Sequence, residues 1–174
     1  MKFIETKIKD LFVIELEPRI DERGHFVRIF AQDELKKTGL AFDIVQANQS
    51  FTKKKGVIRG MHCQLDPKRD GKILQCLSGR IYDVSIDLRL DSPTYKKWFG
   101  IELTAGDNKM VFSGKGFAHG LQTLTSNCLV QYFMSEFYTP DYYSGVRFDD
   151  PAFNIKWSLT PTYVSEQDLN WPLL

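Results

Sequence analysis

Alternation of apolar and polar residues runs through most of this sequence and predicts β-strands. In residues 81–88, IYDVSIDL, every second side chain from Tyr82 to Leu88 falls on one face, whereas Asp83, Ser85 and Asp87 fall on the other. A period of two is that of an extended strand, whose successive side chains point to opposite faces. The same alternation occurs in residues 11–17, 24–30, 97–103 and 128–138.

Turn-forming residues separate these segments, and helical periodicity is scarce. The predicted turns lie at residues 22–24, 78–80, 91–93, 105–107 and 113–116. Only residues 31–40 and 165–171 are predicted as helices, and the second would begin at Ser165 with Asp168 at the capping-box position. Many short strands indicate an all-β fold, a sandwich or jelly-roll barrel with a few short helices. Because no linker or repeat divides the chain, we expect a single domain over residues 1–174.

Charge and cysteine content exclude several classes of partner. The chain has 23 basic and 22 acidic residues, a net charge of +1, so nothing indicates binding to nucleic acid or to an anionic membrane. No apolar run approaches the length of a membrane span, and the N-terminus lacks the pattern of a signal peptide. Cys63, Cys76 and Cys128 show no C-x-x-C spacing, which is typical of free thiols in a reducing cytoplasm. We therefore expect a cytoplasmic protein.

Residues 56–75, GVIRGMHCQLDPKRDGKILQ, contain a histidine and a lysine ten positions apart on two successive predicted strands. His62 would share one side of its strand with Ile58, Gly60 and Gln64, and the glycine would leave that side open to a ligand. Lys72 would begin the next strand. A lone strand histidine is more often a hydrogen-bonded core residue, and a lysine at a strand end is more often a solvated group. These two residues alone do not decide between an enzyme and an inert β-domain.

Other candidate features are equally ambiguous when each is taken singly. A metal site of the cupin type would need a second histidine near His62, but position 64 is glutamine and only His119 could be a later ligand, so the sequence favours a site without metal. The glycine-rich residues 113–120 lack the spacing of a phosphate-binding loop. Tyr132, inside a predicted strand, is typical of packing, and Asp168 is explained by helix capping.

Taken together, the motifs resemble one family over essentially the whole chain. DERGHF, VQANQS, VIRGMHCQ, GFAHG, YFMSEFYTP, VRFDDP and VSEQD occur in the order and spacing of the dTDP-4-dehydrorhamnose 3,5-epimerases, which are nucleotide-sugar epimerases. The combination of RGMH, a lysine ten residues later, GFAHG and a terminal SEQD is specific. The resemblance implies a cupin-like jelly roll that works as a homodimer, without metal or organic cofactor, on a nucleoside-diphosphate 4-keto-6-deoxy sugar. Such a reaction belongs to deoxysugar biosynthesis, for example for lipopolysaccharide or O antigen.

The resemblance also implies a role for individual residues. His62 would be the general base and Asp168 its partner, Tyr132 would be the acid on the opposite face of the sugar, and Lys72 would lie next to the 4-keto oxygen. The residues implied to bind nucleotide and sugar are Arg23, Phe26, Arg28, Gln46, Asn48, Arg59, Lys72, His119, Tyr138, Tyr143 and Gln167.

These residue types suit epimerisation next to a ketone. A proton α to a carbonyl becomes accessible to imidazole when an ammonium stabilises the developing enolate. Inversion then requires a proton from the other face, which a phenol can donate. Since a 4-ketone acidifies both C3 and C5, one site could invert either carbon or both. Two alternatives remain at this stage: a metal-dependent cupin enzyme and a non-catalytic sugar-binding β-domain.

Four residues depart from the pattern of better-known family members. Arg28 and Tyr143 stand where glutamate is frequent, Phe133 where lysine is frequent, and Gln167 where a basic residue is usual. We expect all four near the nucleotide or the pocket rim. They leave open the base, the sugar and which carbon is inverted.

Overall fold

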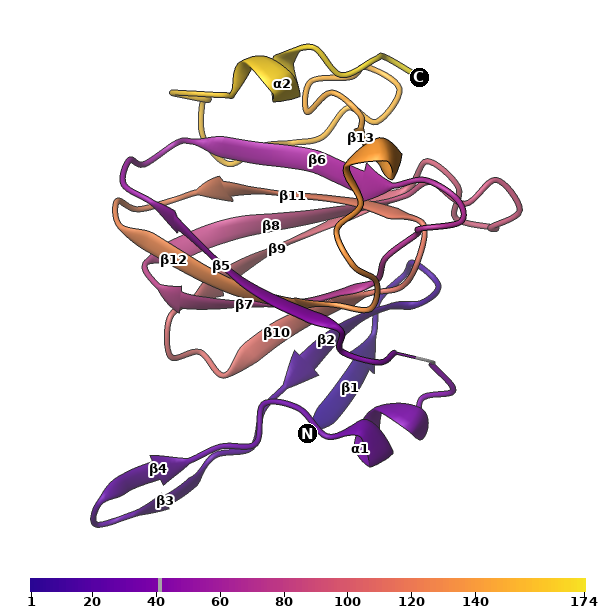
Figure 1. Cartoon of the computed structure of the whole chain (residues 1–174). Helices are drawn as coiled ribbons and strands as arrows, with labels where there is room; N and C mark the ends of the chain where they lie inside the picture. The colour runs from indigo at the N-terminus through magenta and orange to yellow at the C-terminus, as the bar shows by residue number, and fades with distance from the viewer. Residues whose placement is uncertain (41) are drawn as a thin grey trace.

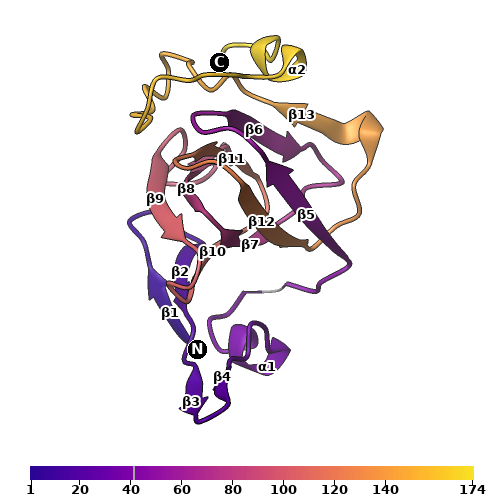
Figure 2. The same cartoon turned by 90° about the vertical axis from the view of Figure 1, so that its left-hand side faces the viewer.

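Two antiparallel sheets face each other and surround a common interior (Figures 1 and 2). The computed structural model describes residues 1–40 and 42–174. The first sheet has six strands in the order β1-β2-β10-β7-β12-β5, and the second has five in the order β13-β6-β11-β8-β9. The predicted all-β fold is confirmed.

The bounds of the elements are as follows. The first sheet contains β1 (Lys2–Glu5), β2 (Leu11–Glu15), β5 (Gln46–Thr52), β7 (Lys72–Ser78), β10 (Lys109–Ser113) and β12 (Cys128–Met134). The second contains β6 (Ile58–Gln64), β8 (Arg80–Asp87), β9 (Trp98–Thr104), β11 (Phe117–Thr123) and β13 (Tyr143–Gly145). The remaining elements are the hairpin β3 (Arg19–Asp21) and β4 (Gly24–Phe26), the helices α1 (Gln32–Lys36) and α2 (Glu166–Leu169), and the 3-10 turn η1 (Pro140–Tyr142).

From Asp83 to Asp87, β8 is buried on both faces, which explains its alternation. Val84 and Ile86 pack outside the barrel in a cluster with Phe153 of the C-terminal segment. The polar face, which carries Asp83 and Ser85, points into the barrel, where Ile81 on the same face belongs to the interior cluster. Alternation here separates two buried environments, one apolar and one polar, rather than core from solvent. The polar face belongs to the wall that carries the site.

Two predicted elements are shorter in the structure. The run at 24–30 forms a strand only in β4, after which Val27, Ile29 and Phe30 pack against the outer face of the first sheet without a strand partner. The helix predicted at 31–40 is the five-residue α1. Its last turn tightens into hydrogen bonds three residues apart, as in the bond from the Thr38 N–H to the Leu35 carbonyl, and that ends the α-helix.

The β3–β4 hairpin projects from the body of the protein (Figure 1). All six of its strand residues are exposed, among them Phe26 with 65% of its surface accessible. A two-stranded hairpin is marginal on its own, and this one holds the large apolar residues Ile20 and Phe26 in water. No helix in the described part of the chain has the length and apolar character needed to cross a membrane.

Candidate active site

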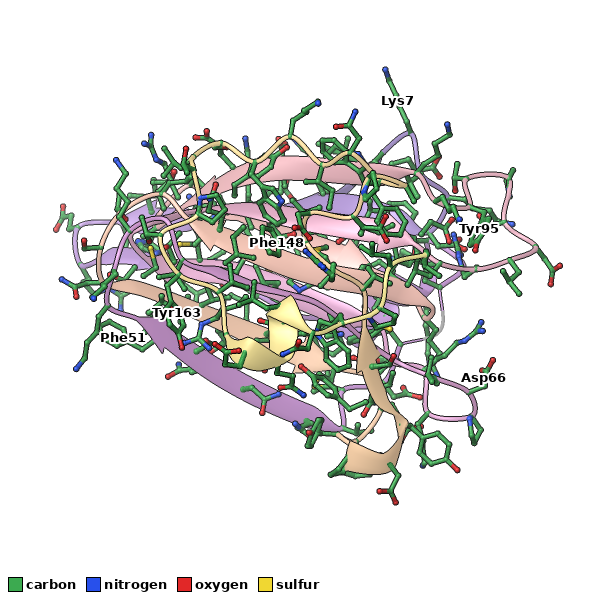
Figure 3. All side chains as sticks on the ribbon, turned by 90° about the horizontal axis from the view of Figure 1, so that it is seen from above. Lys7, Phe51, Asp66, Tyr95, Phe148 and Tyr163 are labelled. Carbon is green, nitrogen blue, oxygen red and sulfur yellow. The ribbon has the colours of Figure 1, made fainter. Side chains whose placement is uncertain are left out.

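A cavity of about 1040 Å³ lies between the two sheets. One wall comes from β5, β7 and β12, and the facing wall from β6 and β11, with residues 162–168 of the C-terminal segment at its edge. Figure 3 shows this segment lying across the strands, with Phe51 and Tyr163, both of which line the cavity, toward the same end of the molecule. A volume of this size accommodates a nucleotide-sized ligand.

His62 and Asp168 form a hydrogen-bonded pair at the edge of this cavity. The His62 Nε2 lies 2.6 Å from Asp168 Oδ1, and the second carboxylate oxygen accepts the Gly60 N–H at 3.1 Å. Trp171 donates its indole N–H to Oδ1 at 3.2 Å. The backbone N–H of Asp168 bonds to Ser165 Oγ, so the predicted helix cap at Ser165 is confirmed and fixes Asp168 on α2.

The surroundings of Asp168 favour its ionised form. Burial opposes the charge, but the hydrogen bond and charge of His62, together with the Gly60 and Trp171 donors, outweigh burial and lower the pKa of Asp168 below its ordinary value. A carboxylate accepts hydrogen bonds only, so the His62 Nε2 carries a proton and its Nδ1 is the basic nitrogen. The pair is thus arranged as a base with an orienting carboxylate.

Lys72 and Tyr132 lie on the sheet that faces His62. Tyr132 on β12 pairs with Leu74 of β7, and Met134 pairs with Lys72, so Lys72 and Tyr132 are diagonal neighbours on one face. Burial raises the pKa of the Tyr132 phenol, Arg59 opposes this shift and Asp70 adds to it. A protonated phenol and a lysine therefore share one wall, while the histidine stands on the other.

His119 occupies the wall beside His62. The two histidines are paired across β6 and β11, and the His119 Nε2 lies 2.6 Å from the buried Asp83 Oδ1. Gly60, expected to leave the histidine side of β6 open, serves a different purpose, because a side chain on Gly60 would lie 2.6 Å from the Gly120 Cα. It is the close approach of β11, rather than an open face, that requires glycine there.

Most of the residues assigned from the sequence line this one cavity. They are Gln46, Asn48, Arg59, His62, Lys72, His119, Tyr132, Tyr138, Tyr143, Gln167 and Asp168. Several are fixed by one another: Gln46 donates to Asn48 and accepts the Tyr138 N–H, and Tyr143 packs against His62 with ring centroids 5.4 Å apart. Burial and the charge of Asp168 raise the pKa of Tyr143, which keeps its phenol protonated.

Three assigned residues are not brought to the cavity within one chain. Arg23 and Phe26 belong to the projecting hairpin, and Arg28 pairs with Glu34 at 3.1 Å beside α1. Among the four departures, Tyr143 and Gln167 do line the cavity. The expectation for Phe133 was wrong, because its ring packs behind the first sheet in the outer cluster with Phe112. Its position alternates with Tyr132, so the two point to opposite faces of β12.

Three functional neighbours were missed in the sequence. Asp83 partners His119, Trp171 contacts Asp168, and Asp70 lies against Lys72. The alternation in β8 placed Asp83 on a polar face, but alternation alone does not show whether such a face is exposed to solvent or lines the barrel interior. Within residues 1–40 and 42–174, no group of three or more histidine, cysteine or acidic side chains is arranged to hold a metal ion.

Comparisons with known proteins identify one family over nearly the whole chain. Residues 5–174 match the family model described as dTDP-4-dehydrorhamnose 3,5-epimerase. A curated relative of that name from Methanothermobacter thermautotrophicus is 39% identical over 98% of this chain and 92% of its own length. The crystal structure of a Bacillus anthracis dTDP-4-dehydrorhamnose 3,5-epimerase with TDP and pyrophosphate bound superimposes with a TM-score of 0.95 at 39% identity, covering 99% of both chains. A Legionella pneumophila epimerase in complex with dTDP-4-keto-L-rhamnose has a TM-score of 0.92 at 33% identity, covering 99% of this chain and 92% of that one. The fold expected from the sequence, the cupin-like jelly roll of these epimerases, is confirmed.

Proposed function

Since the chain belongs to the dTDP-4-dehydrorhamnose 3,5-epimerase family, we propose that four side chains of its cavity carry out the epimerisation. The protein is an isomerase that acts on a nucleoside-diphosphate 4-keto-6-deoxy sugar, at C3, C5 or both, through an enolate. The four side chains are those of His62, Asp168, Lys72 and Tyr132.

His62 removes the proton next to the ketone. Its Nδ1 is the free basic nitrogen, because Asp168 holds the protonated Nε2 at 2.6 Å. The carboxylate also stabilises the imidazolium that forms, as the aspartate does in other histidine–aspartate pairs. Two further donors, the Gly60 N–H and the Trp171 indole, keep the carboxylate in place.

Lys72 and Tyr132 act from the other wall. The Lys72 ammonium stabilises the negative charge on the 4-keto oxygen in a cavity that excludes much of the water, a contribution worth several kcal/mol. Tyr132 then protonates the carbon on the face opposite His62. The observation that carries this proposal is the placement of base and acid on facing sheets, since inversion needs a proton removed from one face and returned to the other.

The remaining residues that line the cavity are proposed to bind the nucleotide and the rest of the sugar. They are Gln46, Asn48, Arg59, His119, Tyr138, Tyr143 and Gln167. Arg59 is available for phosphate because its guanidinium is held by neutral acceptors, the Thr52 hydroxyl and the Phe51 carbonyl. Tyr143 and Gln167, neither of which is charged, make the recognition of the base depend on packing and hydrogen bonds.

A homodimer accounts for the three residues outside the cavity. The hairpin that carries Arg23 and Phe26 projects with its apolar residues in water. We infer that it reaches the cavity of a second copy of the chain, where Arg23, Phe26 and Arg28 bind the nucleotide. The exposed hairpin supports this arrangement, because burial in a partner removes its apolar surface from water.

Three further properties are part of the proposal. We propose that residues 1–174 form one domain, because β1 pairs with β2 at one end of the chain and α2 supplies Asp168 to β6 at the other. A cytoplasmic location is supported by Cys63, Cys76 and Cys128, all buried and free. Catalysis without metal or cofactor is supported by Gln64, whose side chain bonds to the backbone of Lys68, Phe137 and Thr139.

Incubation with a panel of 4-keto-6-deoxy nucleotide sugars in D₂O tests the function. We expect deuterium at C3, C5 or both, with inversion at the exchanging carbon, as followed by NMR. The nucleotide that reacts fastest identifies the base. Absence of deuterium uptake from every member would favour a sugar-binding domain, and uptake only after a divalent metal is added would favour a metal-dependent enzyme.

A further inference from the structure

Asp70 is a buried carboxylate beside the proposed reaction centre that the mechanism does not use. Only 3% of the residue is exposed, and it lines the same cavity as His62 and Tyr132. Its Oδ2 lies 2.8 Å from the Lys72 Nζ. The contact is an ion pair rather than a directed hydrogen bond, and neither oxygen of Asp70 accepts a hydrogen bond from the described residues.

The backbone holds Asp70 at this position. The following residue, Gly71, donates its N–H to Ser135 Oγ at 2.8 Å and accepts the Ser135 N–H at 3.1 Å. A side chain on Gly71 would lie 3.0 Å from the Ser113 carbonyl oxygen and 3.3 Å from the Phe42 ring. Asp70 is therefore tied to the start of β7, two residues from Lys72, and is not part of a free loop.

A buried carboxylate in this state calls for a hydrogen-bond donor. Two oxygens offer about four acceptor sites, and burying them without donors is costly. Lys72 supplies a charge but leaves the acceptor sites open. Because the carboxylate lines the cavity, a bound ligand is placed to supply these donors. A sugar carries hydroxyl groups, which suit these acceptors.

We propose that Asp70 accepts a hydrogen bond from the sugar hydroxyl next to the ketone. This inference rests on the proposed function, in which Lys72 contacts the 4-keto oxygen. In a 4-keto-6-deoxy hexose, only C3 carries a hydroxyl next to that carbonyl, since C5 bears the methyl group and the ring oxygen. A neighbouring ammonium and carboxylate match this arrangement, the ammonium donating to the carbonyl and the carboxylate accepting from the hydroxyl.

The contact makes Asp70 a determinant of substrate specificity. A site whose buried acceptor depends on a substrate hydroxyl discriminates against an analogue that lacks it, because the acceptor is then left without a donor. The same negative charge adds to the raised pKa of Tyr132, which helps to keep the proposed acid protonated. Asp70 thus recognises the hydroxyl group, and Lys72 recognises the ketone.

A pair of substrates separates this role from a purely structural one. One is the 4-keto-6-deoxy nucleotide sugar found active in the panel, and the other is its 3-deoxy analogue. Both keep acidic hydrogens next to the ketone, at C3 and at C5, so deuterium uptake in D₂O can be measured for each by NMR at the carbon that the enzyme exchanges. For the unmodified enzyme we expect the hydroxylated substrate to exchange faster by about 10- to 100-fold, the scale of one hydrogen bond to a charged group. In Asp70→Ala the two rates should lie within about 3-fold of each other.

The possible outcomes are distinct. If Asp70→Ala slows both substrates and keeps the preference, Asp70 acts only on Lys72 and the inference is wrong. Equal rates for both substrates with the unmodified enzyme would also overturn it, while leaving the proposed function intact. If the unmodified enzyme exchanged neither C3 nor C5 of any member of the panel, the proposed function would be overturned, and this inference with it.

Two further variants keep the test decisive. Asp70→Asn preserves the volume of the side chain, and if the alanine variant does not fold, it should reduce the preference at least about 3-fold because a neutral amide is the weaker acceptor. An unchanged preference in Asp70→Asn would then contradict the inference. Glu136→Gln is the matched control, since Glu136 pairs with Lys68 at 3.4 Å away from the lining of the cavity, and it should leave the preference unchanged.

Discussion

His62 Nε2 and Asp168 Oδ1 lie 2.6 Å apart although 106 positions separate the two residues in the chain. The histidine stands on β6, and the aspartate comes from α2, which lies over that strand (Figure 1). Asp168 also accepts the Gly60 N–H, from the strand that carries His62. One carboxylate therefore joins the C-terminal segment to β6 and orients the ring, which links closure of the fold to the chemistry of the base.

Replacing Asp168 by asparagine should disable His62 through the wrong tautomer. The amide oxygen would accept the Gly60 N–H, leaving the NH₂ group toward Nε2, so that Nδ1 would carry the ring proton and lose its basicity. We expect His62→Ala and Asp168→Asn each to lower kcat about 10³-fold, with the double variant only a few-fold worse. Steady-state kinetics of the three variants measure this. If the two losses in kcat multiplied in the double variant, His62 and Asp168 would not act as one unit.

Activity should not depend on a metal ion. Gln64 stands where a metal site would need a second histidine, and backbone groups hold its side chain, so it is not free to join His62 around a metal. Prolonged treatment with EDTA followed by dialysis should leave kcat within experimental error of the untreated enzyme. The control is the same preparation with divalent metals restored one at a time. Loss of turnover that a single metal restores would refute this prediction.

The stability of the protein should depend on Asp87 at neutral pH and not in acid. Burial opposes ionisation of this carboxylate, but hydrogen bonds from Arg89, Ser92 and Thr94 lower its pKa from 3.8 to about 2. A carboxyl group whose pKa is lower in the folded than in the unfolded chain stabilises the fold at pH values above its unfolded pKa. This stabilisation is lost as the pH falls from about 4 toward 2. We expect Asp87→Asn to lower the free energy of unfolding by about 2 kcal/mol at pH 7.

Urea unfolding of Asp87→Asn at several pH values measures that difference. The difference in the free energy of unfolding should shrink as the pH approaches 2. The kcat of the variant at 25 °C should equal that of the unmodified enzyme, because Asp87 does not line the cavity. A difference of the same size at pH 7 and pH 2.5 would show that the carboxylate charge is not the cause.

Local pattern was enough to predict several of the strands, but not the orientation of the sheets. The runs that became β2, β8, β9 and β12 alternate with a period of two, and the cap at Ser165 is a local signal. The alternation at 24–30 looks the same, yet Val27 and Ile29 have no neighbouring strand and pack as an extended segment. A strand requires a partner, and a partner distant in sequence leaves no trace in the run itself.

Asp83 and Asp70 were not predicted as site residues for the same physical reason. Asp83 and Asp70 are charged residues on strands or at strand ends, where the usual interpretation is a solvated side chain. Their burial follows from the closure of the barrel, which turns the polar face of β8 and the start of β7 inward. His62, Lys72, Tyr132 and Asp168 were assigned from motif resemblance, and it is the facing of the two sheets that gives them a common cavity.

Two inactive variants should restore activity when their subunits are mixed. If the hairpin binds the nucleotide in the partner's cavity, a dimer of one His62→Ala and one Arg23→Ala chain has one site with both residues intact. Mixing after reversible dissociation should recover about a quarter of the unmodified activity, from half of the dimers with one site each. The separate variants treated in the same way are the control. No gain on mixing would mean that each site is built from one chain.

Lys72→Ala and Tyr132→Phe should fail at different steps of the reaction. Without the ammonium no enolate is stabilised, so Lys72→Ala should suppress deuterium exchange and inversion together. Both can be followed in one NMR experiment in D₂O, with the unmodified enzyme as reference. Exchange at an unchanged rate in Lys72→Ala would mean that another group holds the enolate charge.

Tyr132→Phe removes only the phenolic hydroxyl and keeps the ring that packs against the interior cluster, so folding should be little affected. The enolate still forms beside Lys72, and His62 can return a proton to the face from which it came. Deuterium should therefore enter the sugar with retained configuration, while the inverted product falls about 10²-fold, the scale for losing one general acid. Normal inversion by this variant would assign the acid to another group, such as Tyr138, which lines the same cavity.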